Sequence, residues 1–137
     1  MRVPRTFGLI VLLAAAAGCG SGGAATGTPT PAGRDELTIM AHSGPGPAVT
    51  WQLTCNPPAG SHPDPATACR VLDEHGDQGL PAVPRDTACT QIYGGPEEAT
   101  ITGTWRGRPV HSSFARTNGC EIARWTALTG LLPAPSS

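Results

Sequence analysis

The stretch from Ala99 to Phe114, ATITGTWRGRPVHSSF, carries the clearest structural signal in the chain. Its first half alternates in character as far as Trp105, and a second extended run starts at Arg108. Alternation with a period of two is typical of a strand with one buried face. Arg106 and Gly107 separate the two runs, so the stretch predicts two strands joined by a short turn.

A second pair of strands is predicted upstream of this stretch. Residues 36–42 (ELTIMAH) alternate, residues 43–47 (SGPGP) form a turn cluster, and residues 49–55 (VTWQLTC) alternate again. Turn residues between two alternating runs favour a hairpin. The sequence therefore supplies two antiparallel strand pairs.

Two helices are predicted between and after these strands. Asp64 and Pro65 have the pattern of an N-cap and a first helical residue, and this helix is expected to stop near Gly76. Its expected buried stripe consists of Ala66, Cys69, Val71, Leu72 and His75. Residues 121–128 (EIARWTAL) have helical spacing of apolar residues as well. Strands and helices in this order predict an α+β fold, an antiparallel sheet with two short helices.

The five cysteines indicate how this fold is stabilised. Cys19 follows the N-terminal apolar run, and Cys55, Cys69, Cys89 and Cys120 are spread through the rest of the chain. A small domain with few aromatic residues usually needs disulfides, and four cysteines allow three pairings. The chain has no CxxC motif and its four histidines share no ligand spacing, so no metal and no other cofactor is expected.

The N-terminal segment has the features of an export signal. Two arginines precede an apolar run at 7–17, which is too short for a membrane-spanning helix of about 20 residues. The sequence Ala16-Ala17-Gly18-Cys19 resembles a bacterial lipobox. We therefore expect a lipoprotein signal peptide at 1–18 and a membrane anchor through lipid on Cys19, against the alternative of a plain secretory signal.

Composition sets the remaining boundaries. Residues 19–34 comprise Cys19 and a Gly-, Ser-, Thr- and Pro-rich stretch that predicts a flexible tether. Residues 35–132 are expected to form one domain, and residues 133–137 (PAPSS) a frayed tail.

The formal net charge is −1, which gives no sign of a nucleic-acid surface. Glu97 and Glu98 are interpreted as solvated. Arg106, Arg108 and Arg116 are interpreted as part of a solvated face, in preference to a small basic patch.

Short motifs then occur in a specific order along the domain. They are LTC at 53–55, HP at 62–63, AC at 68–69, GTWRG at 103–107 and NGCE at 118–121. In this order they resemble the Streptomyces subtilisin inhibitor-like family over roughly residues 36–128. The resemblance implies secreted inhibitors of subtilisin-like serine proteases, often homodimeric, with a five-stranded antiparallel sheet and two helices. It also implies the pairing Cys55–Cys69 and Cys89–Cys120.

The resemblance further implies where a protease binds. In the family the binding loop begins at the first cysteine of the second disulfide, and the reactive bond joins the second and third residues after it. Carried over, the loop positions P3 to P2′ are Cys89, Thr90, Gln91, Ile92 and Tyr93. The reactive bond is then Gln91–Ile92, and Asn118 matches an asparagine that braces the loop. Thr90 and Gln91 depart from the family pattern, which often has Pro at P2 and Met, Lys, Arg or an apolar residue at P1.

Two functions remain open at this point. The first is a protease inhibitor, held at the outer face of the cell membrane or released outside the cell, whose partner is a subtilisin-like serine protease. The second is an envelope lipoprotein that uses the same scaffold as a non-inhibitory protein-binding module. An enzyme is not expected, because no nucleophile motif such as GxSxG surrounds the serines.

Overall fold

The computed structural model of the chain describes residues 34–136. The expected signal peptide, the expected lipid attachment site Cys19 and the expected tether up to residue 33 lie outside the described residues. Within residues 34–136 no helix has the length and apolar character needed to cross a membrane.

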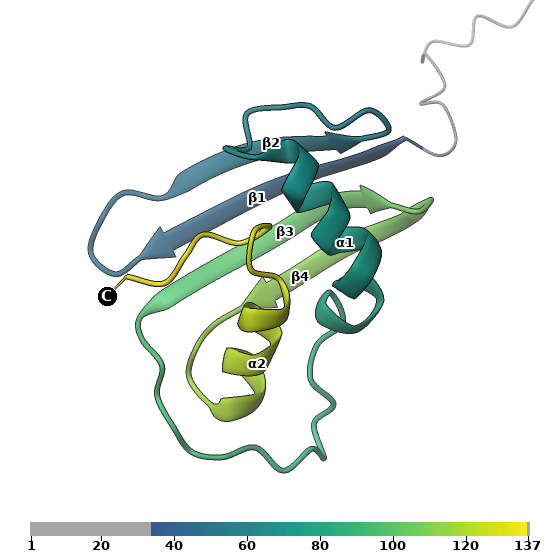
Figure 1. The fold of residues 1–137 in the computed structure, drawn as a ribbon. Helices are drawn as coiled ribbons and strands as arrows, with labels where there is room; N and C mark the ends of the chain where they lie inside the picture. Colours follow the sequence, from purple (N-terminus) through teal and green to yellow (C-terminus); the bar gives the residue numbers. More distant parts are fainter. Residues whose placement is uncertain (1–33, 137) are drawn as a thin grey trace, which may run out of the picture.

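An antiparallel sheet of four strands carries two helices on one of its faces (Figure 1). The elements are β1 (Asp35–Ser43), β2 (Val49–Cys55), α1 (Pro65–Gly79), β3 (Glu97–Trp105), β4 (Arg108–Phe114) and α2 (Gly119–Ala127), and the strand order is β2-β1-β3-β4. This arrangement confirms the predicted α+β class and the two antiparallel strand pairs.

The sheet has four strands where the resemblance implies about five. The connection at 80–96 is the longest between two elements, and it adds no strand to the sheet within residues 34–136. Pro81, Pro84 and Pro96 lie in this connection, and proline has no N–H to donate to a strand ladder. The connection therefore crosses the end of the molecule as an irregular segment.

One hydrophobic core joins the sheet to the helices. Leu37, Ile39 and Ile101 point from the sheet into a fully buried cluster, which Leu72 of α1 and Trp125 of α2 complete. Two disulfides, Cys55–Cys69 and Cys89–Cys120, cross-link the structure in the pairing that the resemblance implies.

The turn between β3 and β4 has the predicted position. Arg106 and Gly107 have φ angles of 49° and 73°, and two central residues with positive φ form the type I′ turn that suits a two-residue hairpin. The backbone N–H of Arg106 donates to Oδ1 of Asp35 at 2.6 Å. Asp35 therefore lies beside this turn, whereas Glu97 lies at the opposite end of β3, paired with Ser43.

Helix α1 begins where the sequence predicts and ends later. Oδ1 of Asp64 accepts the N–H of Thr67 at 3.0 Å, which confirms the cap. Gly76 lies inside the helix and does not end it, and its position there leaves no room for a side chain: a Cβ at Gly76 would lie 2.7 Å from the Trp105 ring. The helix continues to Gly79, and the N–H of Leu80 at its C-cap donates to the carbonyl of Gly76 at 3.0 Å.

The predicted buried stripe of α1 is partly wrong. Cys69, Val71 and Leu72 are buried, but Ala66 and His75 are exposed. Their places facing the core are taken by Ala68 and by the glycines of the last turns, because the helix lies very close to its neighbours.

Candidate functional site

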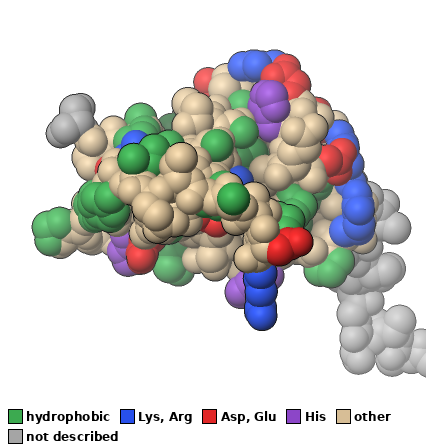
Figure 2. Space-filling view, turned by 90° about the horizontal axis from the view of Figure 1, so that it is seen from below, with side chains coloured by type: hydrophobic (Ala, Val, Ile, Leu, Met, Phe, Trp, Pro, Cys, Tyr) green, Lys and Arg blue, Asp and Glu red, His purple; other side chains and the backbone are tan. Residues whose placement is uncertain are grey.

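The residues predicted to bind a protease lie in the exposed connection between α1 and β3, at the bottom of Figure 1. Thr90 and Gln91 are exposed, and Ile92 and Tyr93 are 56% and 69% exposed. Seen from below, hydrophobic and uncharged atoms make up the middle of this end of the molecule, with charged side chains mainly toward its edges (Figure 2). Large apolar side chains that stay outside the core are available for a partner.

Fixed points flank these four exposed residues on both sides. The N–H of Gly119 donates to the carbonyl of Thr90 at 2.9 Å, and the N–H of Gly94 donates to the carbonyl of Arg116 at 2.6 Å. The Cys89–Cys120 disulfide adds a covalent link at the first of these points. The Gly119 N–H, the Arg116 carbonyl and Cys120 all belong to the short segment 116–120, so this one segment supports the loop at both of its ends.

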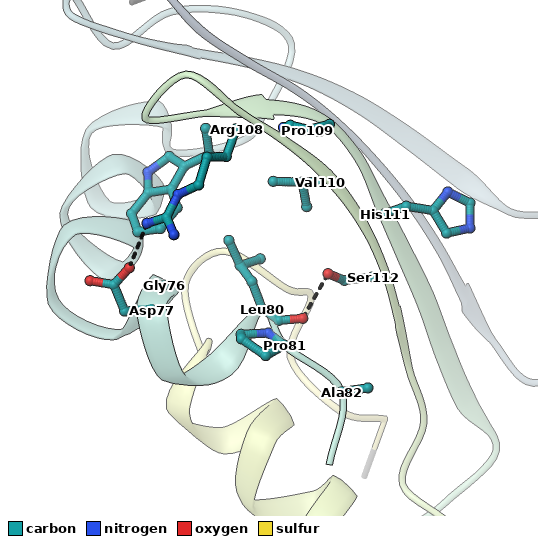
Figure 3. A pocket seen from close by; sticks show the side chains of 11 residues that line it. Gly76, Asp77, Leu80, Pro81, Ala82, Arg108, Pro109, Val110, His111 and Ser112 are labelled. Carbon is teal, nitrogen blue, oxygen red and sulfur yellow. Dashed lines mark hydrogen bonds and ion pairs between the residues drawn. The ribbon is translucent and has the colours of Figure 1, made fainter. Parts of the chain in front are cut away.

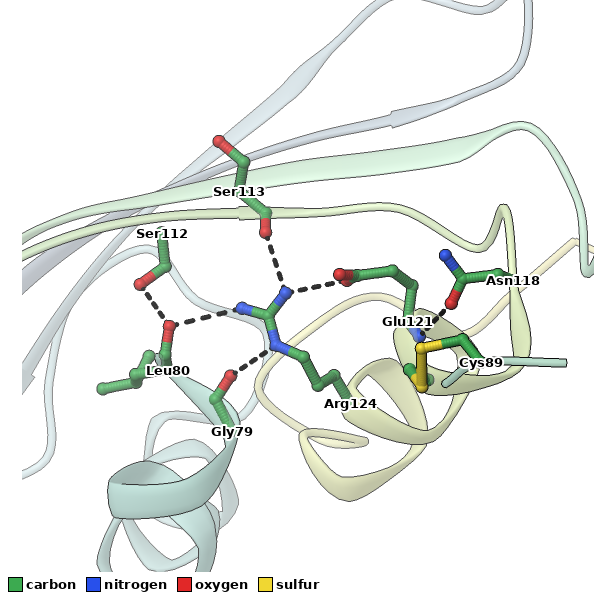
Figure 4. Close-up of polar contacts among 9 residues, drawn as sticks. Gly79, Leu80, Cys89, Ser112, Ser113, Asn118, Glu121 and Arg124 are labelled. Atoms are coloured by element: carbon green, nitrogen blue, oxygen red, sulfur yellow. Dashed lines mark hydrogen bonds and ion pairs between the residues drawn. A yellow bond between two sulfur atoms is a disulfide. The ribbon is translucent and has the colours of Figure 1, made fainter. Parts of the chain in front are cut away.

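Asn118 supports this segment through the start of α2. Its Oδ1 accepts the N–H of Glu121 at 3.0 Å, which makes Asn118 the N-cap of the helix (Figure 4). The hydrogen bond to the loop from this turn comes from the backbone of Gly119 instead. The cap therefore fixes the helical turn that carries Gly119 and Cys120.

Arg124 anchors α2 from inside the protein, a role that the sequence analysis missed. Its guanidinium donates to the carbonyls of Gly79 (3.1 Å), Leu80 (3.3 Å) and Ser113 (3.2 Å), and to Oε2 of Glu121 (2.7 Å) (Figure 4). The same group stacks over Phe114, 4.4 Å from the ring centroid. The detectable signal was an arginine inside the apolar spacing of the predicted helix.

Glu97, which is buried, and Arg116, which is partly buried, form an ion pair next to the loop, so their interpretation as solvated residues is wrong. Glu97 is 1% exposed, and its Oε2 accepts Nη1 of Arg116 at 2.9 Å. Its Oε1 accepts both the N–H (2.9 Å) and the hydroxyl (2.5 Å) of Ser136. The hydrogen bonds from Ser136 and Arg116 outweigh desolvation and lower the pKa of Glu97 to about 2.

An open pocket lies between the end of α1 and β4, and none of the predicted loop residues line it (Figure 3). Two of its polar side chains are already paired: Ser112 donates to the carbonyl of Leu80 at 2.7 Å, and Asp77 forms ion pairs with Arg106 and Arg108. Among residues 34–136 no group of three or more His, Cys, Asp and Glu side chains could hold a metal ion.

Comparison with known proteins gives relatives of one kind. A family model described as "Subtilisin inhibitor-like" matches residues 36–118. Subtilisin inhibitor-like protein 1 of Streptomyces cacaoi is 38% identical over 84 residues, which is 58% of this chain and 74% of that protein. A subtilase-type protease inhibitor of Streptomyces coelicolor is 40% identical over 86 residues, 61% of this chain and 56% of that protein.

A solved structure adds a weaker likeness. Streptomyces caespitosus sermetstatin, in complex with Bacillus licheniformis subtilisin, has a TM-score of 0.45 and 22% sequence identity, and the match covers 72% of this chain and 94% of that one. The assignment rests on the sequence matches instead. Because the family model spans more than half of the 137 residues, this chain belongs to the subtilisin inhibitor-like family, a family of protease inhibitors and not of enzymes.

Proposed function

We propose that this chain inhibits subtilisin-like serine proteases by presenting Cys89 to Tyr93 as a substrate, with Gln91–Ile92 as the reactive bond. The observation that carries this proposal is an exposed four-residue loop held at both ends by segment 116–120. The names of the two relatives given above, a subtilisin inhibitor-like protein and a subtilase-type protease inhibitor, support the class of protease.

Binding uses the backbone of the loop. An extended segment pairs edge-on with the substrate cleft of a protease, and a loop that is already fixed loses little conformational entropy when it binds. In the free protein Nε2 of Gln91 donates to the carbonyl of Cys89 at 3.1 Å. The side chain must leave this carbonyl to enter a specificity pocket, and an exposed hydrogen bond of this kind costs about 1 kcal/mol or less to exchange for another partner.

Inhibition follows from what happens after attack. The catalytic serine adds to the carbonyl carbon of Gln91, and breaking the peptide bond leaves an acyl-enzyme ester and the free amine of Ile92. That amine stays next to the ester, because the N–H of Gly94, two residues after Ile92, is hydrogen-bonded to the carbonyl of Arg116. The amine then attacks the ester, re-forms the peptide and returns the serine. Religation therefore competes with hydrolysis, and the complex persists.

The exposed side chains indicate which proteases fit. Gln91 is uncharged, so it suits a broad subtilisin-type pocket better than a trypsin pocket, whose buried carboxylate requires a cation. Ile92 and Tyr93 offer apolar surface on the other side of the bond.

We also infer export and anchoring, from sequence outside the described residues. Cleavage after residue 18 leaves Cys19 to carry lipid, and the tether at 19–34 then links the domain to the outer face of the membrane. A homodimer, which the family resemblance implies, would use the sheet face that the helices leave uncovered (Figure 1).

Titration of subtilisin with the purified, oxidised protein tests the proposal. We expect stoichiometric inhibition and slow cleavage at Gln91–Ile92 alone. Gln91→Pro should abolish inhibition, whereas Arg85→Pro should retain it. Residue 85 is exposed in the same connection and follows the first residue of a turn closed by the Thr87 N–H and the Pro84 carbonyl, a position that favours proline. An intact protein that leaves subtilisin active would support the binding-module alternative, and rapid cleavage at Gln91–Ile92 would show a loop too loose to inhibit.

A further inference from the structure

A partly buried ion pair lies against the residues that follow the exposed loop, Gly94 and Gly95. We propose that Glu97 and Arg116, secured by Ser136, form a clasp that positions the part of the loop following the Gln91–Ile92 bond. These are positioning residues, because their side chains act through Gly94 and Gly95. The geometric claim stands by itself, and its consequence for inhibition rests on the proposed function.

Arg116 belongs to the clasp through its side chain and contacts the loop through its backbone. Its side chain is held by Glu97, and its backbone carbonyl accepts the N–H of Gly94 at 2.6 Å. Any shift of Arg116 that follows loss of the ion pair also moves the acceptor of that bond. The position of the side chain thereby determines the position of the loop exit.

Gly95 makes a second connection. It has a φ of 143°, and a Cβ there would overlap Oε2 of Glu97 and lie 2.9 Å from Nη1 of Arg116. The backbone of the loop exit therefore rests against the ion pair itself. This close approach explains the glycine at 95, while a Cβ at Gly94 would lie 2.8 Å from the Ile122 side chain.

Each member of the clasp depends on the others. The Glu97 side chain is 1% exposed and that of Arg116 is 16% exposed. Removing one charge therefore leaves the other charge without its partner and with little access to water. Both oxygens of Glu97 are used, one by Arg116 and one by Ser136. The C-terminal residues are thus part of the loop support, although Ser136 belongs to the segment predicted to fray.

The clasp acts on one side of the reactive bond only. On the other side, Thr90 is held by Gly119 and by the adjacent disulfide, which do not involve Glu97. Weakening the clasp should therefore free the amine of Ile92 while the acyl side remains fixed. Religation would slow relative to hydrolysis, and the inhibitor would become a slow substrate.

Amide exchange measured by NMR on the oxidised protein, produced from the full sequence, tests the geometry without a protease. Glu97→Gln keeps the size of the side chain and removes its charge. We expect exchange at the Gly94 N–H to become about 10- to 100-fold faster, the change that corresponds to losing a charge-assisted hydrogen bond, and exchange at the Gly119 N–H to stay unchanged. Ser136→Ala, which keeps its backbone N–H, should give a smaller change at Gly94 and serves if Glu97→Gln does not fold. Equal changes at both amides, or none, would overturn the proposal.

Hydrolysis of Gln91–Ile92 within the subtilisin complex tests the consequence. Glu97→Gln should raise the hydrolysis rate about 10- to 100-fold relative to the unaltered protein. Val71→Ala is the control, because it lowers stability from a buried site on α1 away from the loop and should leave the rate unchanged. A rate that follows stability in both variants would overturn the positioning role. Failure of the unaltered protein to inhibit would instead contradict the proposed function, and the exchange result would still decide whether the clasp exists.

Discussion

The two disulfides provide a matched pair for separating stability from inhibition. They join residues 14 and 31 positions apart, and in the chain-entropy model these separations correspond to about 3 and about 3.7 kcal/mol of stabilisation. Replacing Cys55 and Cys69 by alanine should therefore lower the free energy of unfolding by nearly as much as replacing Cys89 and Cys120. Only the second replacement removes a support of the loop.

Urea unfolding and subtilisin titration of the two double variants measure the two effects. Domains typically have a free energy of unfolding of about 5–15 kcal/mol, so both variants should retain a folded population. We expect the Cys55→Ala/Cys69→Ala protein to inhibit stoichiometrically below its unfolding transition. The Cys89→Ala/Cys120→Ala protein should be cleaved at Gln91–Ile92 as an ordinary substrate.

The opposite pattern would refute the rigid-loop mechanism. If the variant without Cys89–Cys120 inhibited as well as the unaltered protein, the disulfide would not be needed to retain the leaving amine. If both variants lost inhibition in proportion to their stability, the loop would depend on the fold as a whole and not on its local supports.

Three further outcomes follow from single contacts. Gly76→Ala should lower the free energy of unfolding in urea by about 1 kcal/mol and leave inhibition unchanged. Overpacking against Trp105 costs about 1–3 kcal/mol, and the gain in helix propensity of about 1 kcal/mol offsets only part of this cost. The pKa of Glu97 is about 2, against an ordinary value of 4.5, so its negative charge stabilises the folded state above about pH 4.5. This contribution is lost as the pH falls from 4.5 toward 2. The free energy of unfolding, measured across this range, should therefore fall less steeply with decreasing pH in Glu97→Gln than in the unaltered protein. Gln91→Leu should lower the inhibition constant for subtilisin about tenfold, because burying the larger apolar side chain contributes about 1.5 kcal/mol, and an unchanged or weaker constant would argue against Gln91 as the P1 residue.

Local signals predicted most of the fold. The alternation in the strands, the turn at Arg106-Gly107 and the cap at Asp64 depend on residues close together in the sequence, and the structure contains all of them. These features could be predicted because each is decided within a few residues. The count of about five strands came from the resemblance, and the proline-containing connection at 80–96 does not extend the sheet.

Long-range contacts account for what the sequence did not reveal. Glu97 next to Glu98 looks solvated, because its partners Arg116 and Ser136 are 19 and 39 residues away and only the folded chain brings them together. The same applies to Gly76, which resembles a helix terminator until Trp105 is found against it. The loop residues themselves were predicted from the family resemblance, since nothing within Thr90–Tyr93 distinguishes an inhibitory loop from an exposed connection.

The placement of Asp35 at the end of the sheet away from Glu97 has a consequence for an anchored protein. The described chain starts beside the β3–β4 turn, whereas the loop lies at the opposite pole (Figure 1). Lipid on Cys19 would therefore attach the domain to the bilayer by the pole that a protease does not use. A flexible tether that joins the domain at this pole would leave the domain free to turn, and in orientations with this pole toward the membrane the body of the domain would separate the loop from the bilayer.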